Sequence, residues 1–259
     1  MTLDADEITV PVPEVAVCLG TFNRRALLGA ALDSIRRSVG ELPYVIVVAD
    51  GGSTDGSRAY LAEQKDVILI GERGPLRGAV RAFNRCFSIA LDEASEFIAI
   101  MNDDDCFAGP DCEIERAVEM MREDDDLGGV AFEADLRGSW QVERWRDVPT
   151  VTKGVIRREA GMAAARGMGD PTGKAWWGHE HGTYAADQDH SLWMWRLGWK
   201  IAAGKGLRIH DGHTQDQLAR ENLKQYRESG TVKIFQDRWN AWGNLYSHDD
   251  AVRHGGRLL

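Results

Sequence analysis

The first hundred residues alternate between short apolar segments and longer amphipathic ones. The short segments are rich in β-branched residues and are Val15–Leu19, Tyr44–Ala49, Val67–Ile70 and Phe97–Met101. Between them, apolar residues recur at helical spacing, first at Leu28, Leu32, Ile35 and Val39 and later at Leu76, Val80, Phe83, Phe87 and Leu91. Repeated strand–helix–strand units with buried strands predict an α/β fold, in which a mostly parallel central sheet carries helices on both faces.

Three polar clusters directly follow predicted strands. They are Thr21–Asn23 after the first strand, Asp50–Asp55 after the second and Asp103–Asp105 after the fourth. In open parallel sheets, ligands bind outside the carboxyl ends of the strands. The three clusters are therefore expected to meet in one ligand site, and Asn23 is also a candidate cap for the helix that follows it.

The second half of the chain is less regular. A strand is expected at Val151–Ile156, a surface loop at Gly167–Gly182 and a helix at His190–Leu197. Two further helices are predicted near the end of the chain, at Asp216–Ser229 and Val232–Trp242.

Charge and cysteine usage narrow the functional classes. The 259 residues carry a formal net charge of −10, which gives no general attraction to nucleic acid or to anionic membranes. Met1–Pro13 is acidic without an apolar run, and no stretch approaches the ~18 apolar residues of a membrane span, so neither a signal peptide nor a span is expected. The four cysteines form no C-x-x-C pair, which favours reduced thiols and a cytoplasmic location.

The run Asp103–Asp105 is the sharpest chemical feature. Three adjacent carboxylates repel one another unless a positive charge lies among them. Mg²⁺ and Mn²⁺ prefer oxygen ligands and bridge protein carboxylates to substrate phosphates. A solvated acidic turn is the alternative, as at Asp124–Asp126, but only Asp103–Asp105 directly follows a buried strand. The position favours a divalent-cation site.

Three motifs in this order resemble the family 2 glycosyltransferases of the nucleotide-diphospho-sugar transferase superfamily. The motifs are VAVCLGTFNR, VIVVADGGSTDGS and FIAIMNDDD, and the resemblance covers about the first 110 residues well. It implies a Rossmann-like GT-A fold, a UDP- or GDP-linked sugar as donor, and a divalent metal, Mn²⁺ or Mg²⁺. It also implies a division into a donor half at about 14–110 and an acceptor half at about 111–215, followed by a helical extension at 216–259.

The resemblance assigns donor-binding roles to several of these residues. Thr21, Asn23 and Asp50 match positions around the nucleotide, although Gly51 stands where many family members have a second aspartate. Asp103 matches the carboxylate near the ribose and Asp105 the carboxylate on the metal. Asp104 is the alternative if the register shifts by one residue.

Two arginines and two histidines are further candidates. Arg77 and Arg81 precede the fourth strand on a predicted helix, where they either bind the diphosphate or form an ordinary solvated helix face. By resemblance, His210 completes the metal shell, and His213 competes for the same role.

The segment Asp187–Trp193 with its trailing Arg196-Leu197-Gly198-Trp199 resembles the family's catalytic block. Asp187 takes the position of the general base of an inverting transfer, with Ala186 where glutamate is common. A simple helix cap is the alternative. The start of a helix is expected to keep the pKa of Asp187 low.

Trp176, Trp177 and His179 lie just before this block, where an acceptor is expected. Exposed aromatic rings stack on sugar faces, so we expect an acceptor-binding loop, and the alternative is a loop anchored in the core by its tryptophans. Two other functions compete with glycosyl transfer. A sugar nucleotidylyltransferase requires a glycine-rich basic loop that Cys18–Asn23 does not supply, and a non-catalytic nucleotide-sugar-binding protein has no need of Asp187.

Overall fold

The four predicted strands lie side by side in one sheet. The computed structural model describes residues 12–71, 77–109, 111–136, 139–181, 185–212 and 216–241. The strands are β1 (Val15–Thr21), β2 (Tyr44–Asp50), β3 (Val67–Gly71) and β4 (Phe97–Ile100). They run parallel in the order β3-β2-β1-β4, which confirms the predicted parallel arrangement.

The second half of the chain extends the same sheet. The additional strands are β5 (Cys106–Phe107), β6 (Leu127–Leu136), β7 (Ser139–Gln141), β10 (Gly154–Arg157) and β11 (Lys200–His210). β10 lies antiparallel between β4 and β6, whereas β11 is parallel to β6. β8 (Arg144–Trp145) and β9 (Val148–Pro149) form a separate small hairpin. The described sheet has nine strands and is mostly parallel.

The long strands β6 and β11 were not predicted from the sequence. Both are interrupted by glycine, and β11 has few β-branched residues, so neither shows a strong strand pattern. The strand expected at Val151–Ile156 begins only at Gly154. That residue has φ of +154°, and a Cβ there would collide with the carbonyl oxygen of Val130, so a glycine is required where the chain enters the sheet.

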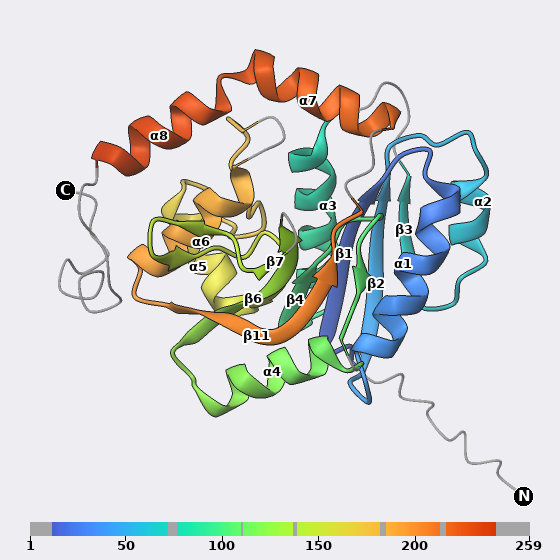
Figure 1. Ribbon diagram of the computed structural model, residues 1–259, viewed down its shortest axis with the longest axis horizontal. Coiled ribbons are helices and arrows are strands. Elements are labelled where there is room, and N and C mark those ends of the chain that lie inside the picture. Colours follow the sequence, from blue (N-terminus) through green and yellow to red (C-terminus); the bar gives the residue numbers. More distant parts are fainter. Residues whose placement is uncertain are drawn as a thin grey trace, which may run out of the picture.

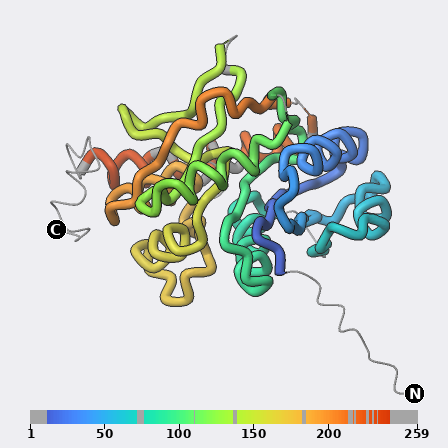
Figure 2. Tube along the Cα trace, turned by 90° about the horizontal axis from the view of Figure 1, so that it is seen from below, coloured from blue at the N-terminus to red at the C-terminus, as the bar shows by residue number. Residues whose placement is uncertain are grey.

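Helices cover both faces, as predicted. Those on one face are α1 (Arg25–Ser38), α2 (Ser57–Ala62) and α4 (Glu113–Glu123), and those on the other are α3 (Ala79–Asp92), α5 (Arg158–Gly167) and α6 (Ala186–Arg196). Side chains of β1 alternate between the two cores, with Val17 and Leu19 on the first face and Ala16 and Cys18 on the second. Figures 1 and 2 show the sheet between these layers.

Two C-terminal helices cross one end of the molecule. They are α7 (Gln217–Ser229) and α8 (Thr231–Ala241), close to the predicted bounds (Figure 1). The Asp216 side chain caps α7 by accepting a hydrogen bond from the amide of Ala219 at 2.9 Å. The proposed boundary between a catalytic domain and a helical extension at this point stays a prediction. None of the described helices is long and apolar enough to cross a membrane.

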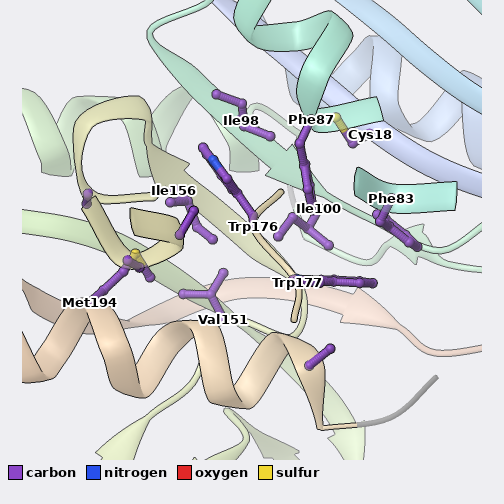
Figure 3. Close-up of a cluster of buried hydrophobic side chains, with 14 of the residues drawn as sticks. Cys18, Phe83, Phe87, Ile98, Ile100, Val151, Ile156, Trp176, Trp177 and Met194 are labelled. Carbon is purple, nitrogen blue, oxygen red and sulfur yellow. The ribbon is translucent and has the colours of Figure 1, made fainter. Parts of the chain in front are cut away.

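The expectation that Trp176 and Trp177 are exposed is wrong. Their relative exposures are 0% and 5%. Trp176 stacks on Phe87, with ring centroids 5.0 Å apart (Figure 3). On its other side its ring lies 5.2 Å from that of His190, and its indole donates to the carbonyl of Gly173. Gly161 makes room for this ring, because a Cβ at that position would overlap it. Trp176 is therefore a core residue and cannot stack on an acceptor.

We expect Trp176→Ala to lower the free energy of unfolding by ~3–5 kcal/mol, because it leaves a large cavity between α3, α5 and α6. Urea denaturation measures this change. The matched control is His179→Ala in the same segment, where the side chain is exposed and the expected change is within ~0.5 kcal/mol. If the Trp176→Ala protein is as stable as the control, Trp176 is not a core residue.

Candidate active site

A cavity of about 760 Å³ opens at the carboxyl ends of β1, β2 and β4. Its wall includes Thr21 at the end of β1, Gly51 after β2 and Asp104 after β4. From the second half of the chain it includes Lys153 before β10 and Asp187 on α6. Segments far apart in the sequence thus meet at the edge of the sheet where a ligand was expected.

Backbone-directed hydrogen bonds hold the loops after β1 and β2 together. Asn23 accepts a hydrogen bond from the amide of Thr54 at 2.8 Å, and its own amide donates to Ser53 at 2.8 Å. Asn23 therefore joins two loops and does not cap α1, which begins at Arg25. Asp50 is fully buried and accepts from the amide of Ser53 at 3.1 Å. Asn23 and Asp50 support the rim of the cavity without belonging to its lining.

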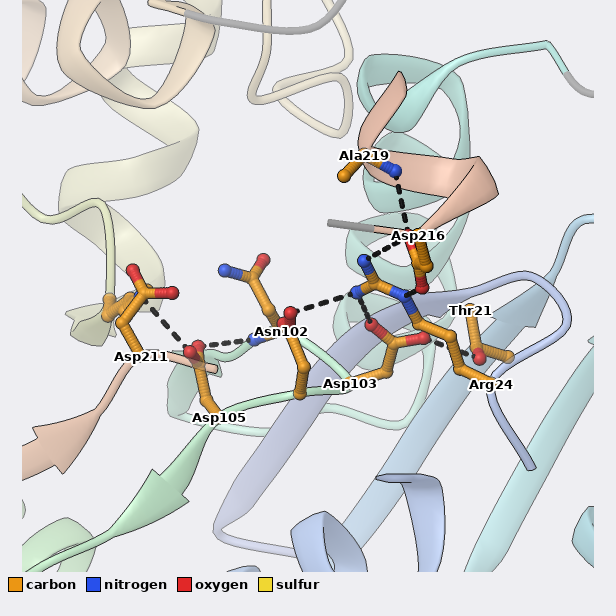
Figure 4. A network of polar contacts seen from close by, with 10 residues as sticks. Thr21, Arg24, Asn102, Asp103, Asp105, Asp211, Asp216 and Ala219 are labelled. Atoms are coloured by element: carbon orange, nitrogen blue, oxygen red, sulfur yellow. Dashed lines mark hydrogen bonds and ion pairs between the residues drawn. The ribbon is translucent and has the colours of Figure 1, made fainter. Parts of the chain in front are cut away.

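Arg24 is the centre of a charged network at the carboxyl ends of β1 and β4 (Figure 4). Its guanidinium binds Asp103 at 2.7 Å and Asp104 at 3.2 Å, and it makes two hydrogen bonds to Asp216, at 2.7 and 3.0 Å. Asp103 also accepts a hydrogen bond from Thr21 at 2.6 Å. Burial raises the pKa of Asp103 to about 6, although Arg24 and Thr21 act in the opposite direction.

Asp105 lies behind this network and does not line the cavity. It is fully buried, accepts a hydrogen bond from the amide of Asn102 at 2.9 Å and pairs with Lys153 at 3.0 Å. The Lys153 ammonium also binds Asp211, so it bridges a buried carboxylate and a cavity-lining one. Burial raises the pKa of Asp105 to about 7, with Lys153 opposing the shift.

Asp104 is the member of the triple aspartate that lies half-buried in the cavity wall. Gly212 packs directly against it, because a Cβ on Gly212 would stand 2.7 Å from the Cβ of Asp104. This close approach brings the backbone next to Asp211 up to Asp104. Asp104, the residue of the alternative register, therefore lies in the cavity wall, whereas Asp105 does not.

Neither Asp105 nor His210, the two residues expected to hold a metal, lines the cavity. His210 is exposed, its ring lies 5.1 Å from that of Trp140, and it is not part of the cavity wall. The following residue, Asp211, lines the cavity instead. His213 lies outside the described residues. Of the two candidate arginines, Arg77 lines the cavity at the start of α3, whereas Arg81 is exposed outside it.

Asp187 lines the cavity near the start of α6, beside Glu143. Burial, and after it the Glu143 carboxylate, raises the pKa of Asp187 to about 7. The expectation of a low pKa at a helix start is therefore wrong, because desolvation and a like charge outweigh the helix dipole here. Gln188 donates to Glu143 at 3.2 Å and links the two acidic side chains.

A second group of possible metal ligands is paired with an arginine. Among the described residues, the set with three ligand atoms close together is Glu180, His181 and Asp189. Arg238 on α8 forms ion pairs with both Glu180 and Asp189. Since the carboxylates already have a cation, this group attaches α8 to α6 rather than forming a metal site. The neighbouring His179 is exposed and outside the cavity wall.

The sequence model of glycosyl transferase family 2 matches residues 16–168, which is more than half of the chain. The chain belongs to this family. A search of curated protein sequences gives no significant match.

Solved structures show that this glycosyltransferase has the GT-A fold. The mannosyltransferase PcManGT from Pyrobaculum calidifontis, in complex with GDP-Man and Mn²⁺, is similar with a TM-score of 0.56 and 18% identity, over 93% of this chain and 73% of that one. S. aureus TarS 1–349 with UDP-GlcNAc is similar with a TM-score of 0.57 and 14% identity, over 85% and 66%. The same TarS segment with UDP matches with a TM-score of 0.56 and 14% identity, over 83% and 65%.

Four residues that line the cavity of this glycosyltransferase were not predicted from the sequence. Arg24 belongs to the GTFNR motif and directly follows Asn23, which was selected as a candidate. Asp211 was one position from the chosen histidine. Lys153 and Glu143 lie in no motif, and only the sheet topology brings them to the strand ends.

We expect Lys153→Met to destabilise the glycosyltransferase by about 3 kcal/mol at pH 8, because Asp105 then stays buried without its cation. The loss should shrink at pH 5, where Asp105, with its raised pKa, is protonated and carries no charge to compensate. Urea denaturation at the two pH values measures both. In the control, Lys200→Met, the lysine pairs with Asp124 at the surface, where water screens the pair, so the expected loss is much smaller. Equal losses for the two variants would contradict a structural role for the Lys153–Asp105 pair.

Proposed function

We propose that the protein is a metal-dependent, inverting glycosyltransferase that moves a sugar from a UDP- or GDP-linked donor to an acceptor hydroxyl. The observation that carries the proposal is the composition of a single cavity. Asp104 and Asp211 line it together with Asp187, a carboxylate whose pKa is raised to about 7. A non-catalytic sugar-nucleotide-binding protein has no use for such a base.

The start of α3 supports diphosphate binding. Arg77, Gly78 and Ala79 line the cavity there, and the first turn of the helix carries no acidic residue. The amide groups and positive dipole end of a helix attract phosphate oxygens, and an arginine adds a full positive charge. We assign this corner of the cavity to the diphosphate.

Asp104 and Asp211 are the residues that fit a divalent cation. Within the described residues, Arg24 pairs with Asp103, Asp104 and Asp216, and Lys153 pairs with Asp105 and Asp211, so that these five carboxylates share the two cations. The excess of carboxylates next to a diphosphate requires further positive charge. A Mg²⁺ or Mn²⁺ ion keeps several positions for phosphate oxygens and water, so two protein carboxylates suffice. When bound, it would neutralise charge on the leaving diphosphate.

Asp187 is assigned as the general base. Its carboxylate takes the proton of the acceptor hydroxyl as that oxygen bonds to the anomeric carbon, and the bond from that carbon to the diphosphate breaks on the opposite face. The product therefore has inverted configuration. A base with a pKa near 7 combines a large ionised fraction at neutral pH with a strong driving force for proton transfer. Trp177 and Glu143 line the same cavity and are assigned to the acceptor side.

The first test concerns the donor. We expect UDP or GDP to bind in the presence of Mn²⁺ and to lose most of its affinity in EDTA, as measured by isothermal titration calorimetry. Asp104→Asn should weaken binding in Mn²⁺ by about tenfold or more.

The matched control is Asp125→Asn, the middle residue of the surface run Asp124–Asp126, which should leave binding unchanged. If neither nucleotide gives heat under any condition, the transferase proposal fails. Equal nucleotide affinity in Mn²⁺ and in EDTA would contradict the metal dependence but not the transferase proposal itself.

The second test concerns the base. Asp187→Asn keeps the shape of the side chain but cannot accept the proton, so we expect donor affinity within a few fold and a kcat lowered by ~10²-fold or more. Before an acceptor is known, release of free sugar from the donor to water provides the assay. An Asp187→Asn enzyme with full turnover would exclude Asp187 from the role.

The pH dependence provides the control. Since Asp187 acts when deprotonated, kcat should fall as the pH is lowered through about 7. Glu143→Gln removes the like charge that helps raise the pKa of Asp187, so the acidic limb should move to lower pH. An unchanged limb would point to another titrating group.

A further inference from the structure

A small hairpin brings an acidic and an aromatic side chain into the wall of the proposed glycosyl-transfer cavity. Glu143 lies just before β8 and Trp145 within it, and both line the cavity. The amide of Thr150 donates to the carbonyl of Glu143 at 2.9 Å, so the pairing of β8 with β9 continues as far as Glu143. Residues two apart in an extended strand project to the same side. The hairpin therefore presents both side chains to the cavity.

Glu143 and the assigned base Asp187 lie close together in this wall. Gln188 connects them, since its side chain donates to Glu143 at 3.2 Å and its amide donates to Asp187 at 2.8 Å. Within the part of the chain that the structure describes, neither carboxylate forms an ion pair. Lys153 acts on Glu143 only at longer range, because its ammonium is held by two other aspartates. Neighbouring carboxylates repel each other, so a positively charged ligand is favoured here.

Aromatic rings complete this part of the wall. Trp145 and Phe235 both line the cavity, with ring centroids 4.8 Å apart and ring planes at 88° to each other. Arg146 lies 6.0 Å from the centroid of the Trp145 ring but outside the cavity wall, so it does not fill the cavity. The face of an aromatic ring attracts an organic ammonium group, whereas it offers no oxygen ligand to a metal ion. A carboxylate beside two such rings therefore fits an ammonium group.

We propose that the acceptor carries an ammonium group, which donates hydrogen bonds to Glu143 while the reacting hydroxyl lies at Asp187. The inference rests on the proposed function and adds to it the chemical class of the acceptor. Because a single glutamine bridges the two carboxylates, the ammonium and the hydroxyl are only a few bonds apart in the acceptor. Amino sugars have this arrangement. Glu143 is thus a specificity-determining residue that selects the acceptor, and Asp187 takes its proton.

Paired sugars test the role of the charge. The probes are glucosamine and galactosamine, and each is compared with glucose or galactose, in which a hydroxyl replaces the ammonium group. Binding to the protein saturated with UDP or GDP and Mn²⁺ is measured by NMR titration at pH 7. For at least one pair, we expect the amine to bind about tenfold more tightly than the neutral sugar, the scale of a charge-assisted hydrogen bond. If neither amine binds more tightly than its neutral partner, the inference is wrong.

Glu143→Gln keeps the size of the side chain but removes its charge, so the preference for the amine should largely disappear. The matched control is Glu119→Gln on the exposed face of α4, which changes the net charge equally and should keep the full preference. Nucleotide affinity within a few fold of the wild type shows that each variant is folded. A preference that survives Glu143→Gln, or that Glu119→Gln abolishes as well, would overturn the inference. Absence of nucleotide binding to the wild-type protein is the separate outcome that contradicts the proposed function.

Discussion

The site depends on two cationic side chains that hold buried aspartates at the ends of the strands. Asp103 and Asp105 are almost completely removed from solvent, and burial alone makes an ionised carboxylate costly. Arg24 compensates the first and Lys153 the second. Each cation also reaches an acidic residue of the second half of the chain, Arg24 at Asp216 and Lys153 at Asp211. Charge compensation therefore joins the two halves around one cavity.

The parts that the sequence predicted well are those with a local cause. β-branched runs followed by polar clusters predicted β1, β2 and β4 and the edge of the sheet where Thr21 and Asp103 lie. This information is contained in neighbouring residues, since alternating elements and buried strands dictate a parallel sheet whatever the rest of the chain does. The family resemblance depended on the same segments, and the family match over residues 16–168 confirms it.

The parts that it missed depend on contacts between distant segments. β6 pairs with both β10 and β11. The glycines in β6 and β11 interrupt the alternation of side chains from which a strand is predicted. The burial of Trp176 depends on the space left by Gly161 and on a stacking partner on α3. Both lie far from Trp176 in the sequence, so its burial could not be predicted from the neighbouring residues. The choice between Asp104 and Asp105 needed the position of Lys153, which lies 48 residues later and belongs to no motif. No local pattern carries that information.

Burial raises the pKa of three aspartates in and behind the wall of this cavity, Asp103, Asp105 and Asp187, but the charges beside them differ. For Asp103 and Asp105, a cation opposes the rise in pKa that burial causes, which suits carboxylates that hold structure. For Asp187, the main neighbouring charge is the Glu143 carboxylate, which adds to the effect of burial. A carboxylate that is raised in pKa and lines the cavity can exchange a proton with a substrate near neutral pH. The arrangement of charge, rather than the aspartates themselves, thus separates the scaffold of the site from its proposed base.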